Sequence, residues 1–271
     1  MVLTRASGAT AEPEILVLPT SADGAHVAAQ RIALAISVAV GARGVAHWVT
    51  TGGSTPGPIY RELADNPLPA AVPWDRVHLW WGDERWVPPE DILSNALACW
   101  DLLLRFVPVP VEQIHVMPIG EALAAGKGPA AVAEQYAAAL HAAGLEISPA
   151  GFPRLDVVLV GIGSDGHLFS VFPGSSSWDE PGWVQAVPAP VHIAPHVERI
   201  TLHPAILEAA RVVVVVAHGA AKAPVIGRIF GAREDRRDLP ALLAVRPGAV
   251  WILDPAAAAA LPPGLREASI G

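Results

Sequence analysis

The chain has 271 residues, enough for one large α/β domain or two small ones. A hydrophobic fraction of 52% and a charged fraction of 16% exclude a disordered or fibrous protein. The net charge of −8 argues against a general nucleic-acid binder, because neutralising phosphates requires a clustered basic surface, and the single cysteine excludes a disulfide framework.

Short β-branched runs alternate with longer alanine-rich segments along the whole chain. The candidate strands are 15–18, 45–50, 76–81, 114–117, 156–161, 199–202, 211–217 and 249–253. The candidate helices are 23–40 with Ser21 or Asp23 as N-cap, a helix from about Pro58, 94–105, 129–143 and 220–230. Residues 212–216 are apolar at every position, so helices must cover both faces of that strand. We therefore expect an α/β fold with a mainly parallel, doubly wound, Rossmann-like sheet and helices on both faces.

No repeat of solenoid period and no linker divides the sequence. We expect a single α/β domain over residues 1–271, in which the irregular segment 173–195 is a lid or a small subsidiary hairpin. The N-terminal residues lack the apolar core of a signal peptide, and no segment approaches the roughly 18 to 20 apolar residues of a membrane span. A cytoplasmic protein without a membrane partner is expected.

The first loop that could carry chemistry is 50–56, between a strand and the helix expected near Pro58. Paired glycines let backbone N–H groups approach an anion, and a helix N-terminus adds a favourable dipole. Gly52, Gly53 and Ser54 are therefore candidate phosphate-binding residues; the alternative is a capped strand–helix turn. An ATP-type P-loop is excluded because the lysine that should follow is absent.

The second loop, 79–88, places Asp83, Glu84 and Arg85 together beside several tryptophans. A solvated salt bridge is the simplest explanation of such a triplet. Its position at the end of a strand favours a site instead, because ligands bind outside the carboxyl ends of strands in open α/β sheets. Arg85 suits a phosphate, a carboxylate or a developing oxyanion.

The third loop, 161–167, formally matches the dinucleotide fingerprint G-x-G-x-x-G. Pro173 and Gly174 follow within a few residues, where the fingerprint requires a continuing helix, so the match is interpreted as a coincidence. What remains is His167, presented by a glycine loop two residues after Asp165 and suited to act as a general base near neutral pH.

Other histidines and glycines carry weaker patterns. The other nine histidines are expected to be ordinary surface residues. His192 and His196 are four residues apart, but Pro195 prevents their pairing on a regular helix, and no metal site is expected. The segment 120–127 has the wrong spacing for a P-loop.

In order and spacing, these three loops resemble those of the 6-phosphogluconolactonase family in the glucosamine-6-phosphate isomerase/deaminase superfamily. The resemblance covers nearly the whole chain. Segments 51–56, 81–88 with Ser94 and Asn95, and 161–174 are similar to the family patterns SGGSTP, WGDERxVP…SN and GxGxDGHxxSLFPG, and segments 199–202, 219–222 and 251–254 are similar to later family segments.

The chain departs from the family pattern around the histidine. The family usually has Pro before the aspartate and Thr then Ala after the histidine, whereas this chain has Ser164, Leu168 and Phe169. Leu168 and Phe169 are expected either to narrow the pocket or to repack against segment 173–195.

The resemblance implies the NagB/RpiA-like fold and hydrolysis of 6-phospho-D-glucono-1,5-lactone to 6-phospho-D-gluconate in the pentose phosphate pathway, with no cofactor. It implies that His167 activates water and protonates the leaving ring oxygen, and that Asp165 supports it. Arg85 would stabilise the oxyanion or anchor the substrate. The residues implied in phosphate and substrate binding are Gly52, Gly53, Ser54, Asp83, Arg199 and Lys222.

Three other functions remain open at this stage. A sugar-phosphate isomerase or aminosugar-phosphate deaminase would share the phosphate-binding loop, and a non-catalytic sugar-phosphate sensor would share the fold. A nicotinamide-dependent enzyme rests only on the glycine match. The expected partner is a phosphorylated sugar lactone, and the expected state is a monomer or small homo-oligomer.

Overall fold

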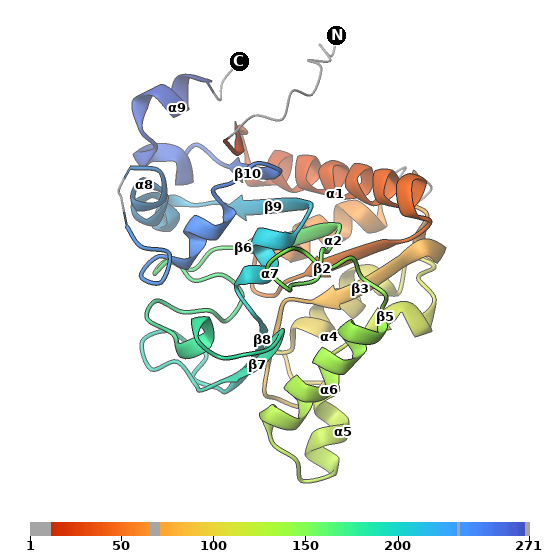
Figure 1. The fold of residues 1–271 in the computed structure, drawn as a ribbon. Helices are drawn as coiled ribbons and strands as arrows, with labels where there is room; N and C mark the ends of the chain where they lie inside the picture. Colours follow the sequence, from red (N-terminus) through yellow and green to blue (C-terminus); the bar gives the residue numbers. More distant parts are fainter. Residues whose placement is uncertain (1–11, 66–70, 232–233, 269–271) are drawn as a thin grey trace.

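The computed structural model describes residues 12–65, 71–231 and 234–268. Within them, seven strands form one sheet in the order β1-β10-β9-β6-β2-β3-β5, and every neighbouring pair is parallel (Figure 1). The strands are β1 Glu14–Val17, β2 Ala46–Thr50, β3 Val77–Trp81, β5 Ile114–His115, β6 Val157–Gly161, β9 Val212–Ala217 and β10 Ala249–Leu253. The parallel α/β fold expected from the sequence is confirmed.

A second sheet has three short antiparallel strands in the order β4-β8-β7. Its strands are β4 Asp83–Arg85, β7 Val184–Val187 and β8 Arg199–Leu202. The sequence predicts only the last of these, and β7 lies inside the segment expected to be irregular. The two sheets are joined at Gly82, whose N–H donates to the Thr50 carbonyl and whose carbonyl accepts from Leu202 N, both at 2.8 Å.

Helices connect the strands. They are α1 Ser21–Arg43, α2 Pro56–Ala64, α4 Asn95–Cys99, α5 Ile119–Ala124, α6 Pro129–Ala142, α7 Ala205–Ala209, α8 Ala223–Gly231 and α9 Pro263–Ala268. A π-helix, Trp100–Leu104, continues α4 and a 3-10 turn, Ala220–Lys222, precedes α8, so the predicted helices 94–105 and 220–230 each divide in two. The short helices α5, α7 and α9 are not predicted by the sequence.

Helix α1 begins differently from the expectation. Thr20, not Ser21 or Asp23, is its N-cap: the Thr20 hydroxyl accepts from Asp23 N, and the Asp23 carboxylate accepts from Thr20 N. By length and composition α1 could also span a membrane, contrary to the sequence-based expectation. It packs as a core helix, however, with eight buried residues: Gly24, Ala25, Ala28, Ala29, Ile32, Ala33, Ile36 and Ala39.

The two faces of the sheet are covered by different helices. Thr50 lies beside Trp81 in register and Val49 beside Trp80, so Thr50 and Trp80 point to opposite faces. The Thr50 hydroxyl lies 2.6 Å from the Tyr60 hydroxyl of α2, while Trp80 contacts the ring of Tyr136 of α6 edge-on. Helices therefore cover both faces, as the apolar β9 requires, and Figure 1 shows α1 and α6 on opposite sides of the sheet.

Candidate active site

A cavity of about 220 Å³ lies at the carboxyl ends of the central strands. Strands β2, β6 and β9 are neighbours in the sheet, and loops from all three line it, together with strands β4 and β8 of the small sheet. Eight of the nine site residues expected from the sequence line this cavity: Gly52, Gly53, Ser54, Asp83, Arg85, His167, Arg199 and Lys222. Asp165, the ninth, contacts His167 directly.

The loop after β2 exposes its backbone to the cavity. A Cβ atom on Gly52 would lie 1.6 Å from Asn95 Oδ1, so no larger residue fits there unless Asn95 moves. Gly53 has φ = 84°, a left-handed conformation that glycine adopts without strain. Helix α2 begins at Pro56, and its N-terminus adds a partial positive charge beside Ser54. With these features the loop is a candidate backbone anion site.

Strand β4 places the three charged residues of the second loop on two faces. Asp83 and Arg85 line the cavity, whereas Glu84 points away and is buried. The Glu84 carboxylate accepts backbone N–H groups of Arg85, Asn95 and Ala96 at 2.8 Å, and so caps α4. Burial raises the pKa of Glu84 to about 7, against the opposing effect of these hydrogen bonds. Glu84 is therefore part of the scaffold of the site.

His167, which lines the cavity, forms a hydrogen-bonded dyad with Asp165. Asp165 Oδ1 lies 2.6 Å from His167 Nδ1 and also accepts His167 N at 3.2 Å. A Cβ atom on Gly163 would lie 2.1 Å from His167 Nδ1 and 2.3 Å from Asp165 Oδ1, so any other residue there would displace one of these two side chains. Burial opposes ionisation of Asp165, but hydrogen bonds from His167 and His192 outweigh it and hold its pKa well below the usual value.

Three cationic side chains face the cavity. Arg85 Nη1 donates to Leu93 O at 2.7 Å, Arg199 Nη2 to Pro195 O at 2.8 Å and Lys222 Nζ to Ile162 O at 2.6 Å. Each of these bonds positions the cation without neutralising it, because the acceptor is a carbonyl. Burial lowers the pKa of Lys222, while the nearby charge of Asp165 favours its protonated form. The cavity is therefore suited to an anionic ligand.

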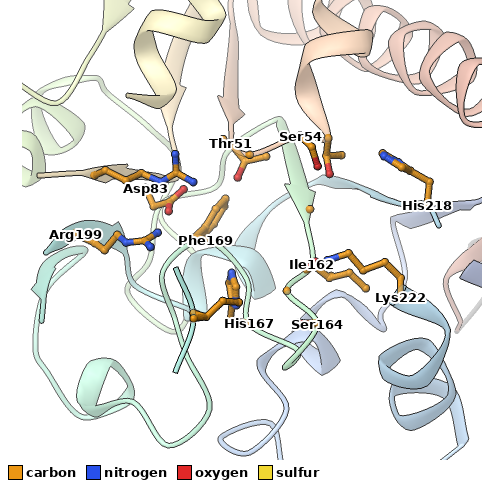
Figure 2. Close-up of a pocket in the computed structure, with 17 residues that line it drawn as sticks. Thr51, Ser54, Asp83, Ile162, Ser164, His167, Phe169, Arg199, His218 and Lys222 are labelled. Atoms are coloured by element: carbon orange, nitrogen blue, oxygen red, sulfur yellow. Dashed lines mark hydrogen bonds between the residues drawn. The ribbon is translucent and has the colours of Figure 1, made fainter. Parts of the chain in front are cut away.

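The cationic groups lie at two ends of the cavity, with His167 between them. Figure 2 shows Asp83 and Arg199 on one side of His167, and His218, Lys222 and Ser54 toward the other. An elongated ligand with an anionic group at one end would therefore place its other end beside the dyad.

The other lining residues are not among the nine site residues expected from the sequence; they are Thr51, Thr55, Gly161, Ile162, Gly163, Ser164, Phe169, Ile193 and His218. Most lie inside the three loops already identified. His218 directly follows β9, so the rule that ligands bind at the carboxyl ends of strands could have found it. Ile193 comes from the irregular segment 173–195 and carries no local signal.

The two departures after the histidine have different positions. Phe169 lines the cavity with its ring against Gly82, where a Cβ would lie 2.0 Å from the ring. Leu168 is only 1% exposed and does not line the cavity. The expectation of a narrowed pocket therefore applies to Phe169, while Leu168 belongs to the core.

The expectation that the other nine histidines are ordinary surface residues is wrong. His47 and His203 are buried, and His218 lines the cavity. In residues 12–65, 71–231 and 234–268, no group of three His, Cys, Asp or Glu side chains is arranged to hold a metal ion. The chemistry that the site offers is general acid–base catalysis by an imidazole close to cations.

Comparison with known proteins points to one family. Residues 19–252 match the family model described as glucosamine-6-phosphate isomerases/6-phosphogluconolactonase. A curated 6-phosphogluconolactonase from Nostoc sp. is 35% identical over 212 residues, covering 78% of this chain and 82% of the relative.

Solved structures give the same result. The 6-phosphogluconolactonase from Trypanosoma brucei superposes with a TM-score of 0.80 at 28% identity, covering 93% of this chain and all of that one. A monomeric glucosamine-6-phosphate deaminase superposes with a TM-score of 0.74 at 16% identity, covering 91% of this chain and 99% of its own, and it shows a shared fold only.

Proposed function

The chain belongs to the glucosamine-6-phosphate isomerase/6-phosphogluconolactonase family, and from this premise we propose that it hydrolyses 6-phospho-D-glucono-1,5-lactone to 6-phospho-D-gluconate, a step of the pentose phosphate pathway. The observation that carries the proposal is the Asp165–His167 dyad at a cavity lined by three cations and a backbone anion site. A lactone that carries a phosphate needs both features: a base for water and an anchor for the anion.

In the proposed mechanism, His167 acts first as a base and then as an acid. Asp165 accepts from Nδ1, which leaves Nε2 to take a proton from water. The water oxygen attacks the lactone carbonyl carbon, and the bond from that carbon to the ring oxygen then breaks. The imidazolium returns its proton to the ring oxygen, so the ring opens to a carboxylic acid that ionises in solution.

The remaining site residues bind the substrate in this proposal. Gly52, Gly53 and Ser54 donate to the phosphate, and Lys222 supplies a cation at the same end of the cavity. The other end, with Asp83, Arg85 and Arg199, holds the lactone ring, where Arg85 or Arg199 faces the developing oxyanion. Ester hydrolysis of this kind transfers no electrons, so the proposal includes no redox cofactor.

The organisation of the chain is part of the proposal. We infer a single sugar-phosphate-binding domain over residues 1–271, in which segment 173–195 is a subsidiary element beside the cavity that supplies Ile193. A cytoplasmic enzyme acting as a monomer or small homo-oligomer is consistent with this role.

The test is a rapid assay on freshly generated lactone, corrected for spontaneous hydrolysis. The wild-type protein is expected to hydrolyse the lactone, and His167→Asn is expected to lower kcat about 10² to 10⁴-fold, the usual contribution of a general acid–base group. His26→Asn is the matched control, because His26 is exposed on α1.

Two outcomes would contradict the proposal. Ammonia release from glucosamine 6-phosphate in place of lactone hydrolysis would assign the protein to the deaminase branch. Tight binding of 6-phosphogluconate without turnover of the lactone would make it a sensor.

A further inference from the structure

A second histidine contacts the catalytic carboxylate. His192 Nε2 lies 2.9 Å from Asp165 Oδ2, the oxygen that His167 leaves unused. The two oxygens of Asp165 therefore have different imidazole partners, one from its own loop and one from a segment 27 residues further along the chain. From the sequence, His192 is not expected to form a metal site with His196, because Pro195 prevents their pairing on a regular helix, and the proposed mechanism does not use it.

Aromatic contacts fix where His192 lies. The ring of Phe172 stands edge-on to the His192 ring, with centroids 5.6 Å apart. The same Phe172 ring also contacts the His167 ring, with centroids 4.8 Å apart. Arg199 Cζ lies 5.8 Å from the centroid of the same Phe172 ring. Phe172 therefore contacts both of the imidazoles that bond to Asp165.

The segment that carries His192 is anchored at other points. His196 Nδ1 lies 2.7 Å from Pro190 O, and Arg199 Nη2 donates to Pro195 O. Ile193, the next residue, lines the cavity. The bond from His192 to Asp165 is therefore a direct link between this segment and the dyad.

We infer that His192 is a positioning residue, whose hydrogen bond to Asp165 Oδ2 holds the carboxylate in the rotamer that orients His167. The terminal torsion of an aspartate is broad and roughly two-fold. The ring and the backbone of His167 both donate to Oδ1, so these two bonds alone do not fix the orientation of the carboxylate. Bonds to both oxygens fix it. A fixed carboxylate keeps the proton of His167 on Nδ1 and leaves Nε2 as the base, in the way that outer hydrogen bonds orient catalytic and metal-binding imidazoles elsewhere.

Other charged groups near Asp165 do not replace His192. Lys222 and Arg228 interact with Asp165 only through their charges, and Lys222 donates its hydrogen bond to Ile162 O. Of the described side chains, only His167 and His192 contribute hydrogen bonds to the low pKa of Asp165. Loss of His192 therefore removes the hydrogen bond to Oδ2 and leaves the two that His167 donates to Oδ1.

The kinetic part of the test compares His192→Ala, His192→Gln and the control His196→Ala. It rests on the proposed lactonase activity. His192→Ala is expected to lower kcat about 10-fold with KM changed less than about 3-fold, because orientation of the base matters in the transition state. His192→Gln retains an N–H donor and is expected to recover most of kcat. His196→Ala alters the same segment without touching the dyad and is expected to resemble wild type.

A spectroscopic readout keeps the inference testable if the lactonase proposal itself fails. Nitrogen NMR of ¹⁵N-labelled histidine reports which ring nitrogen of His167 carries the proton. Wild type and His192→Gln are expected to show the Nδ1–H tautomer alone, and His192→Ala a mixture of tautomers. Absence of lactonase activity in the wild type would end the functional proposal and leave this measurement valid.

Two results would overturn the inference. One is a single, unchanged His167 tautomer in His192→Ala together with an unchanged kcat. The other is a higher KM at constant kcat in both His192→Ala and His196→Ala without rescue by Gln, which would assign His192 to packing of its segment.

Discussion

At the residue scale, the geometry of the site depends on two glycines, because each leaves space that a Cβ atom would fill. Gly163 has no Cβ, and the space that a Cβ would take is filled by Asp165 Oδ1 and His167 Nδ1. Gly52 leaves similar space for Asn95, which in turn donates to the Asp83 carbonyl at 2.8 Å. These glycines therefore set the distance between functional groups rather than contributing chemistry themselves.

Gly163→Ala is expected to separate the dyad while leaving the fold intact. Its backbone is not in the left-handed region, so alanine causes no strain there, but its Cβ must displace Asp165 or His167. A displacement of about 1 Å lowers turnover by about 10²-fold. Steady-state kinetics and thermal unfolding should show a low kcat with a nearly unchanged Tm. Gly41→Ala is the control, since its Cβ meets nothing within 4 Å; equal kcat in both variants would show that the spacing is unimportant.

Much of this detail could be predicted from the sequence, because the motifs are local. The glycine loops, His167, Asp165 and Arg85 are found because each lies directly after an apolar strand, where parallel topology brings ligands. The role of Glu84 could not be predicted. Its burial follows from the pairing of β4 with β8, more than 110 residues away. On the sequence alone, Glu84 is one of three adjacent charged residues, and nothing distinguishes it from Asp83 and Arg85 as a candidate for the site.

At the element scale, the long elements are predictable and the short ones are not. Helices α1 and α6 and strands such as β9 contain enough residues to show a period or an unbroken apolar run. Strands β4 and β7 contain three and four residues and exist only through their pairing with β8. Such elements depend on a tertiary contact. The sequence therefore predicts β8 and offers a small hairpin within 173–195 as one alternative, but it does not locate β4 or β7.

Three histidines, one from each of the neighbouring strands β2, β3 and β5, stack their rings side by side across the sheet. His47 and His78 stack with centroids 4.8 Å apart, and His78 Nδ1 lies 3.0 Å from His115 Nε2. Trp80 Nε1 donates to His47 Nδ1 at 3.2 Å, which requires His47 to be unprotonated on that nitrogen. Burial, together with the charges of the neighbouring histidines, lowers the pKa of His47 and of His115 to about 4.

This stack predicts a loss of stability in mild acid. Between pH 6.5 and 4 the unfolded chain binds protons at His47 that the folded chain does not, so the free energy of unfolding decreases as pH falls. His47→Gln keeps an acceptor for Trp80 and removes the titration. In urea unfolding, its loss of stability between pH 7 and pH 5 should be about 1–2 kcal/mol smaller than that of wild type.

The exposed residue His26 provides the control for this experiment, and Glu84 is unchanged in every variant, so its opposite pH dependence cancels. His26→Gln is expected to follow wild type. An equal change in unfolding free energy between pH 7 and pH 5 in His47→Gln and in wild type would show that the imidazole stack does not resist protonation.

At the scale of the whole molecule, the cavity belongs to no single element. It is lined by loops after β2, β6 and β9, by β4 and β8 of the small sheet, and by Ile193. The parallel sheet could be predicted from the sequence and brings three of these loops together. The small sheet brings the remaining cations, and its position depends on the hydrogen bonds at Gly82. A ligand that fills this cavity connects both sheets.

A ligand of this kind should stabilise the whole fold, and its phosphate should account for most of the effect. Binding only to the folded state contributes about 2.7 kcal/mol at a ligand concentration of 100 Kd, which corresponds to about 5 °C in Tm for a chain of this size. We expect 6-phosphogluconate to raise Tm by this amount, and gluconate at the same concentration to raise it much less, because a phosphate dianion makes charge-assisted hydrogen bonds that a hydroxyl does not.

Lys222→Ala should remove most of the difference in Tm between the two ligands. Lys127→Ala, which alters the chain's only other lysine at an exposed position, should preserve that difference. Equal shifts with both ligands in the wild type would mean that the cavity does not recognise phosphate, and an unchanged difference in Lys222→Ala would move the phosphate to the end of the cavity formed by Arg85 and Arg199.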